Sequence, residues 1–422
     1  PAGAPPAGRP MTNIHAEDRP TRWPAFRHRG FTAYWIALVA TGFAVQILTV
    51  AIGWQVYELT RDPFDLGLVG LSQFAPALAL MLVTGAVADR FSRRWVMAIS
   101  LVIMAGCAAL FALIARTGMS DVLFIFALLA VFGTVRAFYN PARQSIVPNI
   151  VPARDLASAI ALNTTAHNVA TISGPVAGGI LYAVRPDLAY LVAMALLAGS
   201  AALVLRIPKA AHRAPIVGAS WTALSAGLRY ILRDKIVLGA MSLDLFVVIL
   251  GGAAALLPIY ASDILNVGPT GLGVLRAAPA VGAIGVGLYL MTVPIRDHAG
   301  LVLFASVAGF GLFTLIFALS EIFWLSVVAL AIVGGCDMIS VYVRSTLVQL
   351  WTPDELRGRV NSVNQVFIGA SNEVGGFRAG TMAAFVGTVP AVAIGGLGAL
   401  VVAALWMRWF GELRRIRRLD SP

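Results

Sequence analysis

The sequence predicts an all-α membrane protein with twelve transmembrane helices in two pseudo-symmetric halves of six. Its 422 residues are 59% hydrophobic and only 12% charged, whereas a soluble domain has roughly 25% charged residues. The apolar residues gather in stretches of about 20, the length that crosses a bilayer as a helix. In addition, an internal repeat divides these stretches into two similar sets.

Twelve apolar stretches are expected to span the membrane, and the segments between them set the domain boundaries. The expected spans are 32–58, 66–88, 95–115, 121–140, 155–183, 188–205, 236–261, 270–293, 300–318, 322–350, 360–386 and 389–408. The expected domains are an N-terminal tail (1–29), a first half (30–205), a linker (206–235), a second half (236–408) and a basic C-terminal tail (409–422). Residues 1–10 precede Met11, are rich in Pro, Gly and Ala, and are not expected to belong to the fold. The linker stretch SWTALSAGLRYIL predicts an amphipathic helix on the membrane surface.

The distribution of lysine and arginine predicts the orientation in the membrane. Most of the 31 basic residues lie in the tails, the linker and the loops on the side of the termini. The loops on the other side hold only Arg61, Arg116 and Arg185. Because Lys and Arg mark the cytoplasmic side, both termini are expected in the cytoplasm. The net charge of +11 lies in short segments between apolar stretches, so it does not indicate a nucleic-acid partner.

The internal repeat relates the two sets of spans at a constant offset of 201 residues. The stretch that begins RQSIVPNIVPARDL at Arg143 is similar to the stretch that begins RSTLVQLWTPDEL at Arg344. The identical pairs include Arg143 and Arg344, Pro152 and Pro353, Asn163 and Asn364, Gly174 and Gly375, Gly179 and Gly380, and Gly70 and Gly271. Two parallel six-helix halves predict a transporter that rocks around a central site.

The segment after the second span is GAVADRFSRR, residues 85–94. It resembles the signature loop between helices 2 and 3 of the major facilitator superfamily, which has a glycine, an Asp-Arg pair and a basic pair. The matching residues are Gly85, Asp89, Arg90, Arg93 and Arg94. The resemblance implies a cytoplasmic gate, in which Asp89 and Arg90 latch the halves together when the cavity faces outward. The expected partner lies near Pro353–Arg359 and includes Arg357 and Arg359.

A second motif lies in the fifth span and resembles the Gly-Pro-x-x-Gly-Gly pattern of antiporters and exporters in this superfamily. The matching residues are Gly174, Pro175, Gly178 and Gly179. Pro175 lacks a backbone donor and weakens the helix, and the small residues allow close helix contact. The resemblance implies export, and the alternative is that these residues serve helix packing alone.

Two further stretches, RAFYNPARQSIVP and TPDELRGRVNSVN, narrow the resemblance. They are similar to the bacterial branch that includes the enterobactin exporter and related drug-efflux proteins. The resemblance covers the whole chain through the number of spans, the duplication and the placement of loops. Relatives in this branch often carry an acid where this chain has Gly376, and its absence here argues against proton coupling at that position.

Ionisable residues inside the spans are the candidate functional groups, because a charge within the membrane is costly. They are Arg136, Asp244, Arg276, Asp337, Arg344, Glu373 and Arg378. The resemblance implies that helices 1, 4, 7 and 10 line the central cavity. These helices carry Arg136, Asp244, Asp337 and Arg344, and also Gln46, Gln55 and Tyr342 as expected substrate contacts.

An acid inside a span can take up a proton on one side of the membrane and release it on the other. We therefore expect Asp244 or Asp337 to carry a coupled proton. The alternative is a static ion pair of one of these acids with Arg344 or Arg136. Glu373 and Arg378 in the eleventh span are expected to form a structural pair or a gate.

The sequence as a whole predicts a monomeric secondary active transporter in the bacterial inner membrane. It is expected to export small organic or amphipathic molecules, of drug or siderophore type, by rocker-switch alternating access driven by the proton gradient. The expected partners are the substrate, protons and the lipid bilayer, with no cofactor and no metal. The sequence contains no GxxxxGK loop, so ATP is not expected as the direct energy source. It also contains no evident nucleophile–base pair, so an enzyme is not expected. The alternatives are an importer or a lipid flippase of the same fold, or a membrane sensor that does not transport.

Overall fold

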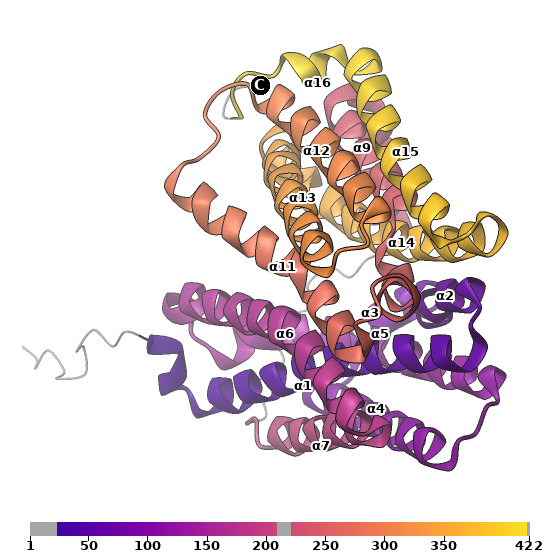
Figure 1. Ribbon diagram of the computed structural model, residues 1–422. Coiled ribbons are helices and arrows are strands. Elements are labelled where there is room, and N and C mark those ends of the chain that lie inside the picture. The colour runs from indigo at the N-terminus through magenta and orange to yellow at the C-terminus, as the bar shows by residue number, and fades with distance from the viewer. Residues whose placement is uncertain (1–22, 209–220, 420–422) are drawn as a thin grey trace, which may run out of the picture.

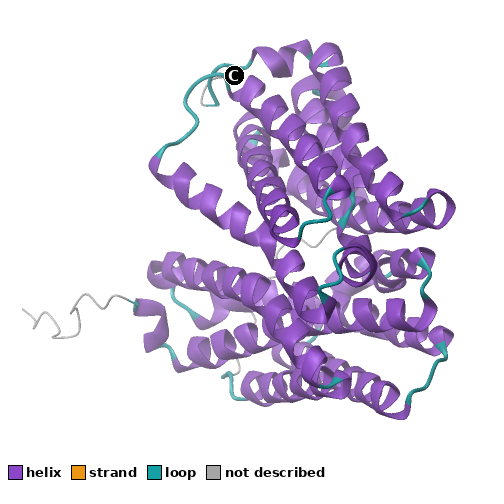
Figure 2. Ribbon diagram, in the orientation of Figure 1, coloured by secondary structure: helices purple, strands orange, loops and turns teal. Residues whose placement is uncertain are grey.

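The computed structural model describes residues 23–208 and 221–419, and the regular structure in these residues is entirely helical (Figure 2). The first half contains α1 (Arg29–Thr60), α2 (Pro63–Ala79), α3 (Met81–Arg90), α4 (Arg93–Thr117), α5 (Val122–Ile150), α6 (Leu156–Val184) and α7 (Pro186–Leu205). After the linker helix α8 (Trp221–Arg233), the second half contains α9 (Lys235–Gly251), α11 (Gly268–Thr292), α12 (Ala299–Leu319), α13 (Phe323–Trp351), α14 (Asp354–Val386) and α15 (Thr388–Trp409). Short elements complete the fold: η1 (Pro24–Arg27), η2 (Ala153–Asp155), η3 (Ala254–Leu256), α10 (Leu257–Ile259), η4 (Tyr260–Ile264) and α16 (Gly411–Arg415).

The twelve expected spans are all present as helices. Among the described residues, nine helices are long and apolar enough to cross a membrane. The other three spans are α2 with α3, α6, and α14. α2 and α3 have only 17 and 10 residues, whereas α6 and α14 carry polar residues such as His167 and Glu373. These three spans lie where the halves meet. Part of their surface therefore contacts protein, whereas the corresponding surface of other spans contacts lipid.

The halves touch along two helix pairs, α6 with α11 and α2 with α14 (Figure 1). Gly179 of α6 packs against the carbonyl oxygen of Pro269 at the start of α11. In the other pair, a Cβ on Gly380 of α14 would lie only 2.6 Å from the carbonyl oxygen of Pro63. Both contacts lie at the face where α1 ends and α11 begins, which we call the opposite face. Toward the terminal face, where α1 begins and α15 ends, α6 and α11 diverge (Figure 1).

The internal repeat is visible in the packing as well as in the sequence. A Cβ on Gly174 of α6 would lie 2.6 Å from Cβ of Gln46 on α1. A Cβ on its counterpart, Gly375 of α14, would lie 2.6 Å from the carbonyl oxygen of Val248 on α9. In each half, therefore, the same repeat position is a glycine because the first helix of that half approaches too closely for a side chain.

Two spans that the sequence predicts as continuous are broken. The second span stops at Ala79 and resumes at Met81, just after Pro76, which removes a backbone donor from the helix. The seventh span, expected over 236–261, stops at Gly251 and continues through η3, α10 and the π-helix η4. The second break exposes backbone carbonyl groups next to α14, and one of the predicted site residues uses them.

The linker helix α8 packs on the second half along one face, and its position on the membrane surface stays a prediction. The hydroxyl of Tyr230 donates to the backbone oxygen of Trp351 at 2.9 Å, and Ile231 is 1% exposed. Gly227 meets the backbone of Arg359 on α14, where a Cβ would lie 2.7 Å from the carbonyl oxygen. One face of α8 is therefore buried against the second half, which offers it apolar contacts and a hydrogen-bond acceptor, whereas Leu228 and Leu232 stay exposed.

Candidate substrate cavity between the two halves

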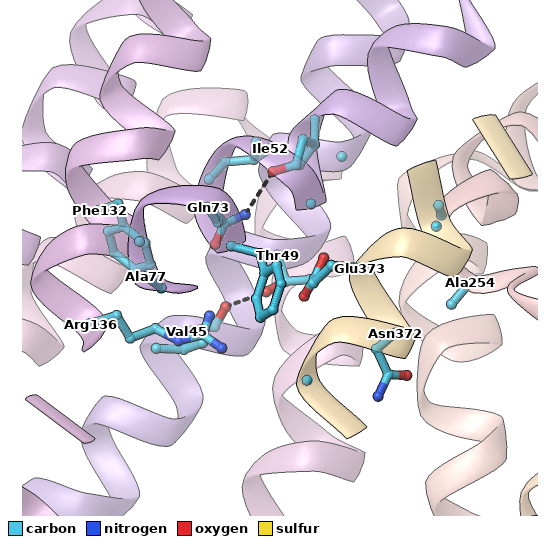
Figure 3. Close-up of a pocket in the computed structure, with 18 of the residues that line it drawn as sticks. Val45, Thr49, Ile52, Gln73, Ala77, Phe132, Arg136, Ala254, Asn372 and Glu373 are labelled. Atoms are coloured by element: carbon cyan, nitrogen blue, oxygen red, sulfur yellow. Dashed lines mark hydrogen bonds between the residues drawn. The ribbon is translucent and has the colours of Figure 1, made fainter. Parts of the chain in front are cut away.

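A cavity of about 660 Å³ lies between the halves, inside the contacts at the opposite face. The first half lines it with α1, α2 and α5, and the second half with α9, η3, α11 and α14. Most of the lining is apolar or glycine, and the polar lining residues are Thr49, Gln73, Arg136, Asn140, Arg276, Asn372 and Glu373. Figure 3 shows Arg136 reaching into the cavity from one side and Glu373 and Asn372 from the other. A cavity of this size and composition is typical of a site for a small organic molecule.

One acid and two arginines form a charged cluster in this cavity. Glu373 of α14 lies within electrostatic range of Arg136 from the first half and Arg276 from the second. The Nε atom of Arg276 is buried and has no hydrogen-bond partner. With all three groups ionised, the cluster carries one excess positive charge. It joins the halves electrostatically, because Glu373 and Arg136 belong to different halves.

Two glycines leave room for this cluster. A Cβ on Gly70 of α2 would collide with carboxylate oxygen Oε2 of Glu373. A Cβ on Gly53 of α1 would lie 3.4 Å from Nη2 of Arg276. The space taken by the charged groups is therefore provided by missing side chains on α1 and α2, the two neighbouring helices of the first half.

The predicted proton carriers lie elsewhere in the second half. Asp244 of α9 and Arg344 of α13 form an ion pair, and their side chains are 12% and 6% exposed. This is the alternative that the sequence left open, a static pair between two helices. Asp337 lies within electrostatic range of both groups. None of the three lines the cavity between the halves, and a proton-coupling role for Asp244 or Asp337 stays a prediction.

The expected pair of Glu373 and Arg378 does not form between these two described side chains. Arg378 instead donates from Nε to the backbone oxygen of Ile249 at 2.9 Å and from Nη2 to that of Leu250 at 2.5 Å. These carbonyl groups belong to the last turn of α9, where the broken helix leaves them without partners. A cation is favoured at a helix C-terminus, so the break draws Arg378 away from Glu373.

The three uncharged residues that the sequence placed in the cavity have other contacts. Gln46 packs over Gly174 of α6, and Gln55 accepts a hydrogen bond from the hydroxyl of Tyr190 at 2.5 Å. Tyr342 packs against the apolar core of the second half. None of them lines the cavity. α1 instead presents Thr49 and Gly53 to it, because the helix is rotated with its glutamines toward its own half.

The motif in the fifth span, now α6, serves packing on both of its sides. Gly174 and Gly178 face α1, where a Cβ on Gly178 would lie 2.9 Å from Cα of Ile47. Gly179 faces α11, and the carbonyl oxygen of Pro175 receives the close approach of Gly273 from α11. The motif therefore lies at the contact between the halves. This position agrees with helix packing alone and also with a role in export, because a rocking transporter needs close packing there.

The gate residues remain within their own halves in this state. Arg93 donates to the backbone oxygen of Ser145 at 2.9 Å, and Arg94 to that of Ile207 at 2.9 Å. On α14, Arg357 pairs with Asp354 at 2.6 Å. The remaining predicted members are less constrained: Arg90 and Arg359 are exposed, and a Cβ on Gly85 would meet open space. The side chain of Asp89 lies outside the described part of the chain, so the latch stays a prediction.

The three charged residues of the cluster are visible in the sequence as intramembrane charges, but their association is not. The sequence marks Arg276 as an intramembrane charge but gives it no role, and it does not mark Gly53 or Gly70 as part of a site. The three charged residues and the two glycines come from five different helices, so no spacing along the chain brings them together. The available signal was the glycines on two helices that are otherwise rich in large apolar side chains.

The fold and the cavity between its halves define a multi-pass membrane transporter of the major facilitator type, not an enzyme. The chain belongs to the transmembrane secretion effector family, whose model matches residues 20–421. It is 27% identical over 418 residues to the enterobactin exporter EntS of Citrobacter koseri, with 94% of each chain covered. It is 26% identical over 410 residues to EntS of Salmonella typhimurium, again with 94% of each chain covered.

Solved structures share the same fold at low sequence identity. A variant of the nucleoside transporter NupG has a TM-score of 0.72 at 14% identity, with 90% of this chain and 99% of that chain covered. A bacterial homolog of the human lysosomal transporter Spinster, in an inward-facing and unoccupied conformation, has a TM-score of 0.71 at 15% identity. In that case 93% of this chain and 98% of the other are covered.

Proposed function

We propose that this chain is a secondary active exporter of small organic molecules, that it works by alternating access, and that the proton is its coupling ion. The proposal depends on one observation: Glu373 faces Arg136 and Arg276 in a cavity shared by both halves. The cavity volume of about 660 Å³ suits a small organic molecule. Export is the direction stated in the names of the EntS relatives.

Glu373 connects protonation with the relation between the halves. When ionised, its carboxylate attracts Arg136 across the cavity, and when protonated it loses this attraction. A substrate that brings a hydrogen-bond donor or a positive charge to the carboxylate competes with the proton for the same oxygen atoms. Antiport requires such competition, because binding of the substrate must release the proton on the same side.

The orientation in the membrane determines which side the cavity faces. The excess of Lys and Arg at the terminal face supports a cytoplasmic location of both termini. With that orientation, the described state is closed outside and open to the cytoplasm, ready to load a substrate for export. In the other state the halves separate at the opposite face, and residues 85–94 approach Pro353–Arg359 to close the cytoplasmic side.

A transport assay with a charge-neutralising variant tests this proposal. Ligands found by thermal shift with the purified protein are assayed for accumulation in everted membrane vesicles under an imposed pH gradient. We expect Glu373→Gln to bind the same ligands and exchange them, but to lose most of the acceleration that the pH gradient gives to the unaltered protein. Glu412→Gln is the control, because Glu412 is an exposed acid outside the cavity and outside both gate segments.

Each alternative predicts a distinct result in this assay. Movement of the ligand only in the inward direction would overturn export in favour of an importer. An unchanged response to the pH gradient in Glu373→Gln would overturn the role of this acid. Ligand binding without movement in any preparation would identify a sensor.

A further inference from the structure

Arg143 and Arg344 occupy the same position in the two halves but differ in their surroundings. The repeat offset pairs them, and Arg344 is neutralised by Asp244. The same offset places Phe43 opposite Asp244, so the first half has no acid at that position. Among the described residues Arg143 has no ion pair, and its Nε atom is buried without a hydrogen-bond partner.

The electrostatic neighbours of Arg143 do not compensate its charge. Among the described residues, the ionisable groups within electrostatic range of Arg143 include Tyr34, Tyr139, His167 and Arg136. The two phenols carry no negative charge at neutral pH, and Arg136 adds a second positive charge. The side chain of Arg143 is partly buried, and an anion from outside the chain would supply the counter-charge that its described neighbours do not.

Arg143 lines a separate cavity of about 320 Å³. Its walls come from α1, α5 and α6, so it lies within the first half and apart from the cavity shared by the halves. Asn163 of α6, another repeat residue, lines the same cavity, and its Oδ1 atom is buried without a donor. Thr164 and Gln144 add hydroxyl and amide groups to the wall and are exposed, so the cavity is open to its surroundings.

We propose that this cavity is a second binding site, and that it takes an oxyanion with a hydrogen-bond donor beside it. The guanidinium of Arg143 binds the carboxylate or phosphate oxygens, since its planar fork matches both groups. The neighbouring hydroxyl or N–H of the ligand donates to Oδ1 of Asn163. A hydroxy acid in solution has this chemistry, and so does the headgroup of phosphatidylglycerol. The site lies on the terminal-face side of the first half, because its lining comes from the last turns of α5, the first turns of α6 and the start of α1.

Equilibrium binding tests the site independently of any transport activity. The full-length protein in phosphatidylcholine nanodiscs is titrated with 2-hydroxybenzoate in a calorimeter. We expect Arg143→Gln to weaken binding by about ten-fold or more, because a charge-assisted hydrogen bond is lost. Asn163→Ala should weaken it by a smaller factor, and 2-hydroxybenzamide, which keeps the hydroxyl but lacks the charge, should not bind. Arg154→Gln is the matched control, since it removes an exposed arginine from the same half.

Nanodiscs that also contain phosphatidylglycerol distinguish the two sources of the ligand. If the lipid headgroup occupies the site, its presence should reduce the affinity of the unaltered protein for 2-hydroxybenzoate. If the site takes a solute, that affinity should be the same in both kinds of nanodisc. Either result, reduced or equal affinity, supports an oxyanion at Arg143. Equal affinity of Arg143→Gln and the unaltered protein would overturn the proposal. Loss of binding in Arg276→Gln instead would place the anion in the cavity between the halves and also overturn it.

Discussion

Arg61 at the end of α1 and Asp263 in η4 form an ion pair between the two halves, with Arg61 Nη1 3.1 Å from Asp263 Oδ1. The hydroxyl of Tyr57 donates to the second carboxylate oxygen of Asp263. Arg61 also donates to Oγ of Ser262 at 3.2 Å. These contacts lie at the opposite face, next to the glycine contacts of the helices. They join the halves where the cavity is closed, so their strength affects which face is open.

Weakening this pair should shift the protein toward the state that is open at the opposite face. Both side chains are partly exposed, and such a pair contributes up to about 1 kcal/mol. Arg61→Gln should therefore change the ratio of the two states by up to roughly five-fold. Asp263→Asn should act more strongly, because it weakens the contacts with Tyr57 and Arg61 together. Spin labels at residues 119 and 321, in opposite-face loops of the two halves, measure the distance that should lengthen.

The ion pair of Arg185 with Asp187 is the control for this prediction. It lies at the same face, with Arg185 Nε 2.7 Å from Asp187 Oδ1, but both residues belong to the first half. Arg185→Gln should leave the distance distribution between the labels unchanged. A shift as large as that of Asp263→Asn would mean that loss of charge, and not loss of the bridge, changes the state.

Gly70→Ala should disable the charged cluster without unfolding the protein. The added Cβ would collide with Oε2 of Glu373, and the flexible carboxylate would have to move away from Arg136 and Arg276. We expect proton-driven transport to fall strongly, while the thermal unfolding temperature changes little because only a side-chain end is displaced. Gly106→Ala on α4 is the control, since its Cβ would meet nothing within 4 Å. Normal transport by Gly70→Ala would show that the position of Glu373 is not critical.

The helices could be predicted from the sequence because lipid requires each span to be apolar over a fixed length. The expected span 95–115 is α4, Arg93–Thr117, and the expected span 300–318 is α12, Ala299–Leu319. The break of the seventh span at Gly251 could not be predicted. Its carbonyl groups are satisfied by Arg378 from another helix, and the local sequence does not contain that partner.

The site was predictable in its residues but not in its pairs. All three charged members of the cluster were identifiable as intramembrane charges, because such residues are rare. Spacing along a helix shows which residues share a face, but not which neighbouring helix that face meets. Glu373 and Arg378 were therefore matched by their closeness in sequence, whereas the rotation of α14 turns Glu373 into the cavity and Arg378 toward α9.

The attachment of the linker helix should depend on Tyr230. Its hydroxyl donates to the backbone oxygen of Trp351 at 2.9 Å, so Tyr230→Phe should lower the free energy of unfolding by about 1 kcal/mol. Burial raises the pKa of Tyr230 above its usual value, and the nearby charge of Asp234 adds to the effect. The folded state then holds the phenolic proton more tightly than the unfolded state does. This contribution is complete below about pH 10 and is lost as the pH rises through the folded pKa.

The free energy of unfolding, measured between about pH 8 and about pH 11, separates the contribution of Tyr230 from the contributions of the other tyrosines. Tyr230→Phe should lose less stability over that interval than the unaltered protein, since one titrating group is gone. Tyr289→Phe, which removes a phenol that is 61% exposed, should follow the unaltered protein. If Tyr230→Phe has the same alkaline slope as the unaltered protein, the buried hydroxyl does not contribute.

The ion pair of Asp244 and Arg344 should be required for stability rather than for coupling. Its side chains are 12% and 6% exposed, so Arg344→Met would leave a carboxylate buried without its partner. We expect a loss of about 3–5 kcal/mol in the free energy of unfolding. The double variant Asp244→Leu with Arg344→Met should recover most of it, because replacing both members of a buried pair with apolar groups is often neutral. Arg357→Gln, which breaks the more exposed pair with Asp354, should cost less than about 1 kcal/mol.

The same double variant distinguishes a static pair from a proton carrier. Asp244 does not line the cavity between the halves, whereas Glu373 does. We therefore expect the double variant to keep its response to an imposed pH gradient in everted vesicles, even though one intramembrane acid has been removed. If it folds stably but no longer responds to the gradient, the coupled proton belongs to Asp244, and Glu373 holds the arginines of the cavity in place.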